Sequence, residues 1–209
     1  MRDRIGVLIS GRGSNLQALI DAIETGALRA SLRVVISNRP GVEGLVRAEA
    51  AGIETILMPH REYADRESYD RALVVALQSR GVDLVCLAGF MRLLGPAFCE
   101  AFPNAVLNIH PSLLPAFPGV DAQAQAHAHG VRISGATVHF VTPELDSGPI
   151  IAQASVPIED GDSVDAIAQR ILQVEHAIYP SAVDRVLHSP WRIEGRRVVF
   201  GDQSRTDLR

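Results

Sequence analysis

The feature that most constrains the fold is the regular alternation of apolar runs with amphipathic segments. Residues 5–10 and 83–88 are largely apolar runs bounded by turn residues, which is the pattern of strands buried on both faces of a sheet. Helical spacing of apolar residues covers 14–24 and 65–79, and each of these segments ends shortly before a glycine. This order predicts an α/β fold wound on both sides of a mostly parallel sheet, with right-handed crossovers.

The second half of the chain departs from this pattern. Two alternating β segments flank a turn at residues 146–148, so we expect an antiparallel C-terminal extension of the Rossmann-like sheet. We find no repeat or linker and expect a single domain over residues 1–209, with a frayed polar tail at 202–209. The other expected elements are strands at 32–37, 53–58, 105–109, 135–142 and 150–156, helices at 44–51, 122–129 and 163–187 (with Pro180 as a point where the last could break), a proline-rich loop at 111–119, and a hairpin at 191–200 turning at Gly195.

Composition excludes several classes of protein. The chain has 209 residues and a formal charge of −4, which argues against a protein that coats nucleic acid. It contains no apolar run long enough to span a membrane, so we expect small-molecule partners, with no nucleic acid and no membrane. Cys86 and Cys99 lack Cys-x-x-Cys spacing, and the N-terminus lacks a signal-peptide pattern, so we expect a cytoplasmic protein.

A glycine-rich turn joins the first expected strand to the first helix. The sequence Gly-Arg-Gly-Ser-Asn at residues 11–15 lets an anion approach the free N–H groups of the helix N-terminus, and Ser14 and Asn15 add side-chain donors. This pattern predicts a site for a phosphate monoester. The dinucleotide fingerprint is incomplete because Leu16 stands in place of its third glycine, and no Gly-Lys pair follows as in a P-loop. A tight turn in which Ser14 caps the helix remains an alternative.

Asn108 and His110 form a second cluster at the carboxyl end of an expected strand. Strand alternation places both side chains on one face, at the edge where open α/β sheets bind ligands. An amide can donate a hydrogen bond to an oxyanion, and an imidazole can move a proton, so the pair suits carbonyl chemistry. A helix-capping asparagine beside a buried structural histidine remains an alternative reading.

Asp146 lies in the turn between the two alternating β segments. An Asx-turn is the ordinary reading of such a residue. If it lies near His110, its carboxylate would favour the protonated imidazolium and make His110 an acid. We expect no metal, because His127, His129 and His139 lack the spacing of a zinc site, and no serine hydrolase, because Gly-x-Ser-x-Gly is absent from the sequence.

Five stretches, taken together, resemble one family. They are residues 9–17, 87–92, 108–115, 137–149 and 175–180. In this order and spacing the chain resembles the phosphoribosylglycinamide formyltransferases, the folate-dependent transformylases of glycinamide ribonucleotide, over residues 5–180. The resemblance implies the formyltransferase fold and a one-carbon transferase of purine biosynthesis. It also implies 10-formyltetrahydrofolate as the formyl-donor cosubstrate, no metal, and a monomer or weak homodimer.

The resemblance further implies roles for individual residues. It marks Asn108, His110 and Asp146 as catalytic. It assigns the phosphate of the ribonucleotide to Gly13, Ser14 and Asn15, and it places Glu175 near the glycinamide end of that substrate. Folate contacts are implied for Arg66, Met91, Arg92, Leu93, Leu94, Asn108, Thr142, Pro143, Glu144 and Leu145. Without the resemblance, Arg66 and Glu175 read as solvated charges and residues 91–94 as ordinary core.

Related families share only part of this pattern. Methionyl-tRNA formyltransferases have an additional RNA-binding domain, and formyltetrahydrofolate hydrolases have an additional N-terminal regulatory domain. Neither the hydrolases nor the sugar-nucleotide formyltransferases share the loop at 11–15, so this loop favours the transformylase. The alternatives kept open are a formyl-folate hydrolase, another formyltransferase, and a non-enzymatic folate or nucleotide sensor. Residues 120–123 depart from some members, which place a histidine there, and this puts only peripheral contacts in doubt.

Overall fold

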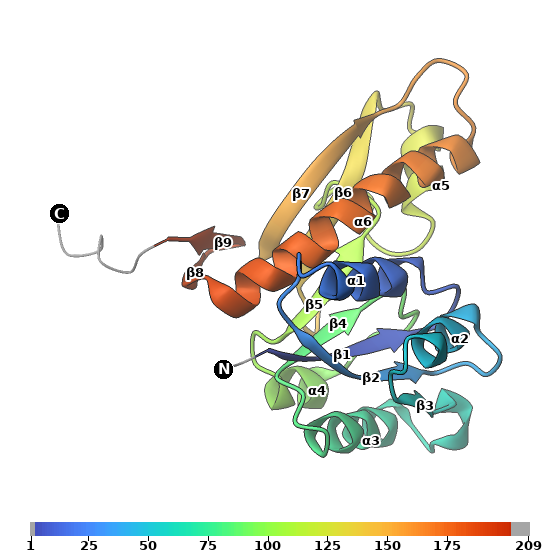
Figure 1. Ribbon diagram of the computed structural model, residues 1–209. Coiled ribbons are helices and arrows are strands. Elements are labelled where there is room, and N and C mark those ends of the chain that lie inside the picture. The colour runs from blue at the N-terminus through green and yellow to red at the C-terminus, as the bar shows by residue number, and fades with distance from the viewer. Residues whose placement is uncertain (1–2, 202–209) are drawn as a thin grey trace, which may run out of the picture.

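The computed structural model describes residues 3–201, and its elements are drawn in Figure 1. Within these residues nine strands form one sheet in the order β3-β2-β1-β4-β5-β6-β7-β9-β8. The tail at 202–209, for which fraying is predicted, lies outside the described residues. The strands are β1 (Arg4–Ile9), β2 (Ser31–Ser37), β3 (Thr55–Leu57), β4 (Leu84–Leu87), β5 (Val106–His110), β6 (Ile133–Phe140), β7 (Ile150–Pro157), β8 (Trp191–Glu194) and β9 (Arg197–Phe200). The helices are α1 (Ser14–Glu24), α2 (Glu43–Ala50), α3 (Arg66–Gln78), α4 (Pro96–Ala101), α5 (Ala122–Ala128) and α6 (Val164–His188), with a 3-10 turn at His60–Glu62.

The sheet changes from parallel to antiparallel pairing after β5. Strands β1 to β5 pair in parallel, whereas β6 pairs antiparallel with both β5 and β7. This confirms the mostly parallel sheet with an antiparallel extension. The β5–β6 register sets Asn108 opposite His139 and His110 opposite Thr137. Two polar side chains from strands distant in the sequence therefore become direct neighbours at the edge of the parallel part.

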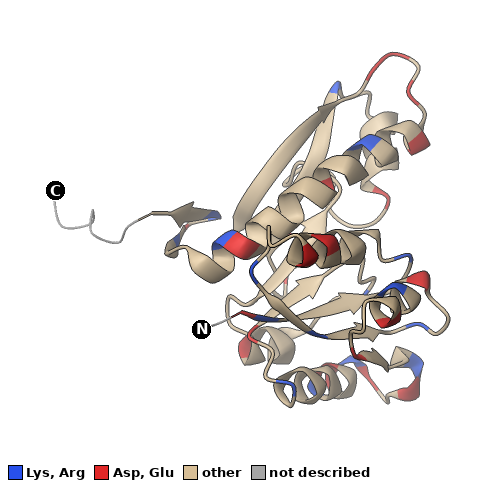
Figure 2. Ribbon diagram, viewed as in Figure 1, with Lys and Arg blue, Asp and Glu red and all other residues tan. Residues whose placement is uncertain are grey.

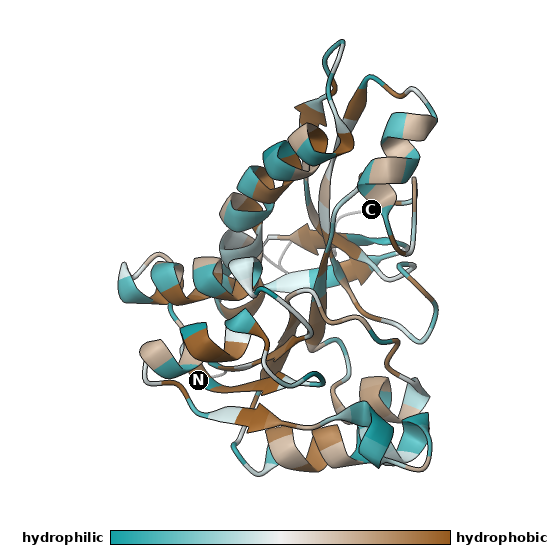
Figure 3. Cartoon of the chain, turned by 90° about the vertical axis from the view of Figure 1, so that its right-hand side faces the viewer, coloured by the Kyte–Doolittle hydropathy of each residue, from teal (hydrophilic) through white to brown (hydrophobic). Residues whose placement is uncertain are grey.

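Helices cover both faces of the parallel part, which explains its continuous apolar strands. On β1, Ile5, Val7 and Ile9 pack in a core cluster that includes residues of α1, α2 and α6. Leu8, on the opposite face of the strand, belongs to a second cluster with residues of α3 and α4. Figure 3 shows apolar strands inside and helices of mixed hydropathy around them. With both faces buried, the strands need no polar side.

Two elements differ from those expected. Helix α4 has six residues, too few to show a helical period in the sequence, and Pro96 occupies its start. Helix α6 runs through Pro180 without a break for 25 residues. A proline removes one helical hydrogen bond, and here the buried neighbours Tyr179, Ala182 and Val183 hold both halves of the helix against the sheet. The hairpin of β8 and β9 turns at Gly195 as expected, with a φ of 60°.

No helix within residues 3–201 has both the length and the hydropathy of a bilayer-spanning segment.

Candidate active site

The ends of β5 and β6 and the loop between β6 and β7 bring three polar side chains together. Asp146 Oδ2 lies 3.5 Å from His110 Nδ1, and Asp146 Oδ1 lies 3.7 Å from His139 Nε2. The three side chains are 9%, 5% and 3% exposed, respectively. Because so little water reaches them, interactions among their charges and dipoles are stronger than at the surface. The structure thus places Asp146 within reach of His110, although 36 positions separate them along the chain.

The loop between β5 and α5 fixes the orientation of His110. The carbonyl oxygen of Phe117 lies 2.9 Å from His110 Nε2, and a carbonyl can only accept, so Nε2 carries a proton. The N–H of Gly119 donates to Asp146 Oδ2 at 2.8 Å. Together these contacts turn His110 Nδ1 towards Asp146. A second proton on Nδ1 would give an imidazolium with the carboxylate beside it.

His139 is the member of the cluster that sequence reasoning missed. Its Nδ1 donates to the carbonyl of Phe140 at 2.9 Å, so Nε2 is left as the acceptor for the Asn108 side-chain amide at 3.2 Å. Burial lowers the pKa of His139, which keeps it neutral at pH 7. His139 therefore orients the Asn108 amide, and His110 is the imidazole whose Nδ1 faces Asp146. The signals in the sequence were its place in the stretch at 137–149 and strand alternation, and the second required the β5–β6 register to be interpreted.

A candidate anion site lies at the start of α1. Gly13 is the N-cap residue with a φ of 73°, a conformation that favours glycine. A Cβ at Gly13 would lie 2.6 Å from the Gly44 Cα, so the loop packs directly on the backbone of α2. Arg47 donates to the carbonyl of Arg12 at 3.0 Å, which places a guanidinium beside the loop. The loop thus offers free N–H groups and a helix dipole to an anion, while the nearby Arg47 guanidinium is also paired with Glu43.

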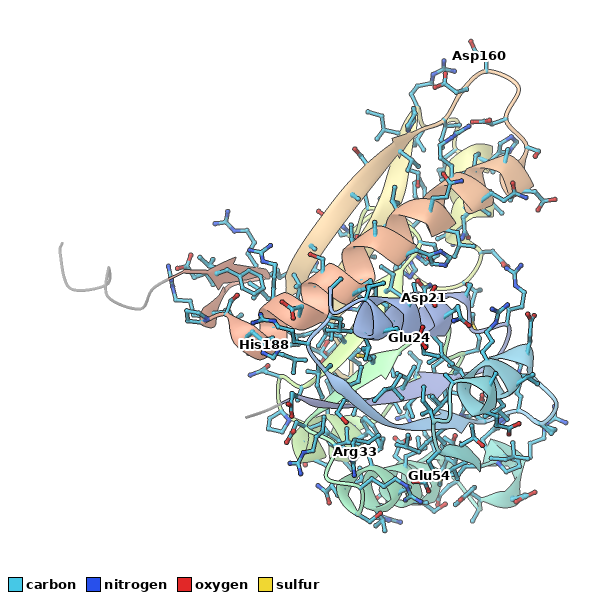
Figure 4. All side chains as sticks on the ribbon, viewed as in Figure 1. Asp21, Glu24, Arg33, Glu54, Asp160 and His188 are labelled. Atoms are coloured by element: carbon cyan, nitrogen blue, oxygen red, sulfur yellow. The ribbon has the colours of Figure 1, made fainter. Side chains whose placement is uncertain are left out.

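The surrounding charges leave this helix end accessible to an anion. The acidic residues of α1, Asp21 and Glu24, lie in its C-terminal half (Figure 4). An open groove of about 810 Å³ begins at Ser14 and follows α1 and α6, and its lining contains Asp21 and Asp184 as well as Arg47 and His176. Figure 2 shows blue and red segments interspersed over the helices. Charges of the two signs offset each other at a distance, so an anion at the loop is affected mainly by the charges close to the loop.

Asn15 and Glu175 meet across 160 positions of sequence. The Asn15 amide donates to Glu175 Oε2 at 2.8 Å, and both residues are buried. Burial raises the pKa of Glu175 to about 7, while the hydrogen bond from Asn15 acts in the opposite direction. Among the described residues, Asn15 Oδ1 is buried without a hydrogen-bond partner. The pair therefore joins the glycine loop to α6 and retains an unused acceptor.

The raised pKa of Glu175 gives a test by stability. A pKa that is higher in the folded state than in the unfolded state contributes stability at low pH, and this contribution disappears as the pH rises from about 4.5 through about 7. We therefore expect Glu175→Gln, which keeps an acceptor for Asn15, to gain about 2–3 kcal/mol of unfolding free energy over the wild type between pH 5 and pH 8. Urea unfolding at the two pH values measures the difference. Glu24→Gln, an exposed carboxylate on α1, is the control, and equal pH dependence of wild type and Glu175→Gln would contradict the prediction.

The residues implied for folate lie on four segments, namely the start of α3, the loop between β4 and α4, strand β5 and the β6–β7 loop. Met91 and Leu93, between β4 and α4, are 63% and 49% exposed, and Leu145, in the β6–β7 loop, is 48% exposed. Leu94 is buried, so its side chain packs in the core. The guanidinium of Arg92 lies 5.7 Å from the ring centre of Tyr69. Exposed apolar side chains are a surface on which a flat heteroaromatic ligand can pack. The other residues in question are Arg66 at the start of α3 and Thr142, Pro143 and Glu144 in the β6–β7 loop, of which Thr142 is half-buried and the others are exposed.

Comparison with known proteins identifies the family that carries this geometry. The formyl transferase family model matches residues 3–183. The phosphoribosylglycinamide formyltransferase of Escherichia coli (strain K12) is 47% identical over 192 residues, which cover 92% of this chain and 88% of that protein. This chain belongs to the phosphoribosylglycinamide formyltransferase family.

Other members of the family agree in fold and differ in length. A solved glycinamide ribonucleotide transformylase 1 from Symbiobacterium toebii has a TM-score of 0.94 and 52% identity, covering 96% of this chain and 94% of that one. This match confirms the formyltransferase fold. The trifunctional purine biosynthetic protein adenosine-3 of Drosophila melanogaster is 50% identical over 184 residues, which cover 87% of this chain and 14% of that protein. The chain thus spans only a small part of this longer relative.

Within residues 3–201, no group of three His, Cys, Asp or Glu side chains is arranged to hold a metal ion. The thiols of Cys86 and Cys99 are unpaired within the same range, and burial raises the pKa of both. A thiol with a raised pKa is a poor nucleophile at neutral pH.

Proposed function

We propose that the chain transfers the formyl group of 10-formyltetrahydrofolate to the amine of 5′-phosphoribosylglycinamide. The products are formylglycinamide ribonucleotide and tetrahydrofolate, in the synthesis of purines (IMP). The observation that carries the proposal is the cluster in which one buried imidazole, His110, faces Asp146 while a second, His139, is held neutral and orients Asn108. Relatives named for this reaction support it.

The proposed mechanism assigns one task to each group. The substrate amine attacks the formyl carbon, and the tetrahedral intermediate develops an oxyanion that Asn108 and protonated His110 stabilise through hydrogen bonds. His110 helps deliver a proton to the nitrogen of the departing folate, directly or through water, while the attacking nitrogen loses a proton, so no proton is consumed overall. Asp146 keeps His110 charged and in orientation. The loop at 11–15 holds the phosphate and so fixes the amine near the formyl carbon.

The cosubstrates complete the proposal. The donor packs on Met91, Leu93 and Leu145, which are exposed. The partners are small molecules, the chain acts as one domain that is a monomer or weak homodimer, and the reaction takes place in the cytoplasm. The chemistry rests on side chains and requires no metal.

The deciding experiment measures the nucleotide product by mass spectrometry. Purified protein receives 10-formyltetrahydrofolate with or without the ribonucleotide. We expect formylated ribonucleotide only when both are present. Release of formate regardless of the ribonucleotide would replace the proposal with a formyl-folate hydrolase, and tight binding without product would indicate a sensor.

The glycine loop gives a separate prediction. Ser14→Asp places a negative charge at the first residue of α1, where it favours the helix dipole but repels a phosphate. We expect the KM for the ribonucleotide to rise at least about tenfold, with the KM for the folate within about twofold. Steady-state kinetics in both substrates tests this, with Ser14→Asn as the neutral control of similar size. Equal losses for the two substrates would contradict a phosphate site at this loop.

A further inference from the structure

The segment between β4 and α4 is held from behind by two buried polar side chains. Met91 N donates to the hydroxyl oxygen of Ser10 at 2.8 Å, and Gly95 N donates to Asp70 Oδ2 at 2.7 Å. Ser10 is 4% exposed and Asp70 is 2% exposed. Between these two anchors Met91 and Leu93 present their side chains to solvent. The segment therefore has a fixed backbone beneath an exposed apolar surface.

Ser10 belongs to a chain of hydrogen bonds that crosses three strand ends. Its hydroxyl donates to Asn38 Oδ1 at 2.6 Å, just after β2, and the Asn38 amide reaches His60 Nδ1 at 3.4 Å, after β3. These contacts fix the direction of each hydrogen bond. The Ser10 hydroxyl accepts from Met91 N and donates to the Asn38 carbonyl oxygen, and the Asn38 amide donates to His60 Nδ1. Ser10 N also donates to the carbonyl of Gly89 at 3.1 Å. The start of the segment is thus tied to the carboxyl ends of β1 and β2.

Asp70 sets the other end of the segment. A Cβ at Gly95 would lie 3.0 Å from Asp70 Oδ2, so the glycine allows this close approach of backbone and carboxylate. Burial raises the pKa of Asp70, while the Gly95 N–H, Arg66 and Arg92 act in the opposite direction. A buried carboxylate is costly unless it is hydrogen-bonded, which is the role that Gly95 N fills here.

We propose that Ser10 and Asp70 are positioning residues for the donor site, fixing the backbone of residues 91–95 so that its exposed side chains are preorganised for the folate. This inference rests on the proposed function, since that function assigns the donor to the segment. Neither side chain reaches the exposed surface of the segment. Each therefore acts through the backbone N–H group that donates to it, Met91 N for Ser10 and Gly95 N for Asp70. Preorganisation of a binding surface lowers the ordering cost of binding. Loss of an anchor should therefore weaken donor binding more than ribonucleotide binding.

The test compares Ser10→Ala with Ser134→Ala. Ser134 is also buried, and its hydroxyl has no hydrogen-bond partner among the described residues, so it controls for removing a buried oxygen. We expect Ser10→Ala to raise the KM and the Kd for 10-formyltetrahydrofolate about tenfold while the KM for the ribonucleotide changes less than about twofold. Ser134→Ala should change neither. An unchanged donor Kd in Ser10→Ala, or equal rises for both substrates, would overturn the inference.

Asp70 supplies a rescue experiment. Asp70→Ala removes the acceptor for Gly95 N, whereas Asp70→Asn retains one, so the asparagine variant should recover most of the donor affinity lost in the alanine variant. Equal loss in both would contradict positioning through this hydrogen bond. If Asp70→Ala fails to fold, Ser10→Ala alone tests the inference.

Failure of the proposed function can be distinguished from failure of this inference. A wild type that binds the folate but forms no product would refute the proposed function, and the donor Kd of the variants would still test whether Ser10 and Asp70 position the segment. A wild type that binds no folate would overturn both.

Discussion

His110→Ala is expected to lower kcat by about 10³-fold while the protein remains folded. Its imidazole is the proton donor and one of the two oxyanion donors in the proposed mechanism, and each such role is worth roughly 10²–10³ in rate. Steady-state kinetics with both substrates, together with thermal unfolding, measures the two quantities. Since the loss lies in the transition state, the KM values should change little.

The control for this prediction is His127→Ala. His127 is exposed on α5, and its Nε2 lies 3.1 Å from the carbonyl oxygen of Asp162. This variant should keep wild-type kcat. Added imidazole should restore part of the activity of His110→Ala, because the cavity left beside Asp146 can accept it. A His110→Ala enzyme within tenfold of the wild type would exclude His110 as the acid.

Asp146→Asn is expected to cost about as much as removing the imidazole, near 10³-fold in kcat. The substitution removes the charge beside His110 but keeps an acceptor for Gly119 N. Asp146 has a φ of 47°, and asparagine tolerates this left-handed conformation, so the backbone should remain in place. The comparable loss of an orienting carboxylate in catalytic triads is about 10⁴-fold.

Asp160→Asn makes the same chemical change at a site without a role. Asp160 lies at the tip of the β7–α6 loop (Figure 4), at the opposite end of β7 from the loop that carries Asp146, and pairs with Arg132 at the surface. Such an exposed pair contributes little, so this variant should match the wild type in rate. If Asp146→Asn retained more than a tenth of wild-type kcat, His110 would not depend on the carboxylate.

The fold was predictable where burial of a segment produces a hydrophobic pattern in its own sequence. The run at residues 5–9 of β1 and the run of β4 lack polar side chains because helices cover both faces, and such runs can be recognised without any tertiary knowledge. Helix α4 was not predictable, because six residues complete fewer than two turns. The continuity of α6 through Pro180 depends on tertiary packing that overrides the local preference.

The same distinction holds for the candidate site. Asn108 and His110 stand close in sequence, so their shared face followed from strand alternation. Asp146 entered through its turn and through the resemblance. The neutral His139 and the contact between Asn15 and Glu175 depend on strand register and helix packing, which no local pattern encodes. The structure therefore adds the buried side chains that orient the catalytic residues predicted from the sequence.

The contact between Gly13 and Gly44 limits how this protein can be engineered. A designer who wished to strengthen α2 would replace Gly44 by alanine, since glycine weakens a helix by about 1 kcal/mol. That Cβ would lie 2.6 Å from Ile9 Cδ1 and 3.0 Å from the carbonyl oxygen of Gly11, so it would press on the loop beneath α1. Thermostabilisation that targets helix propensity alone would thus act against the anion loop, and the two glycines must be treated as a single unit in any redesigned library.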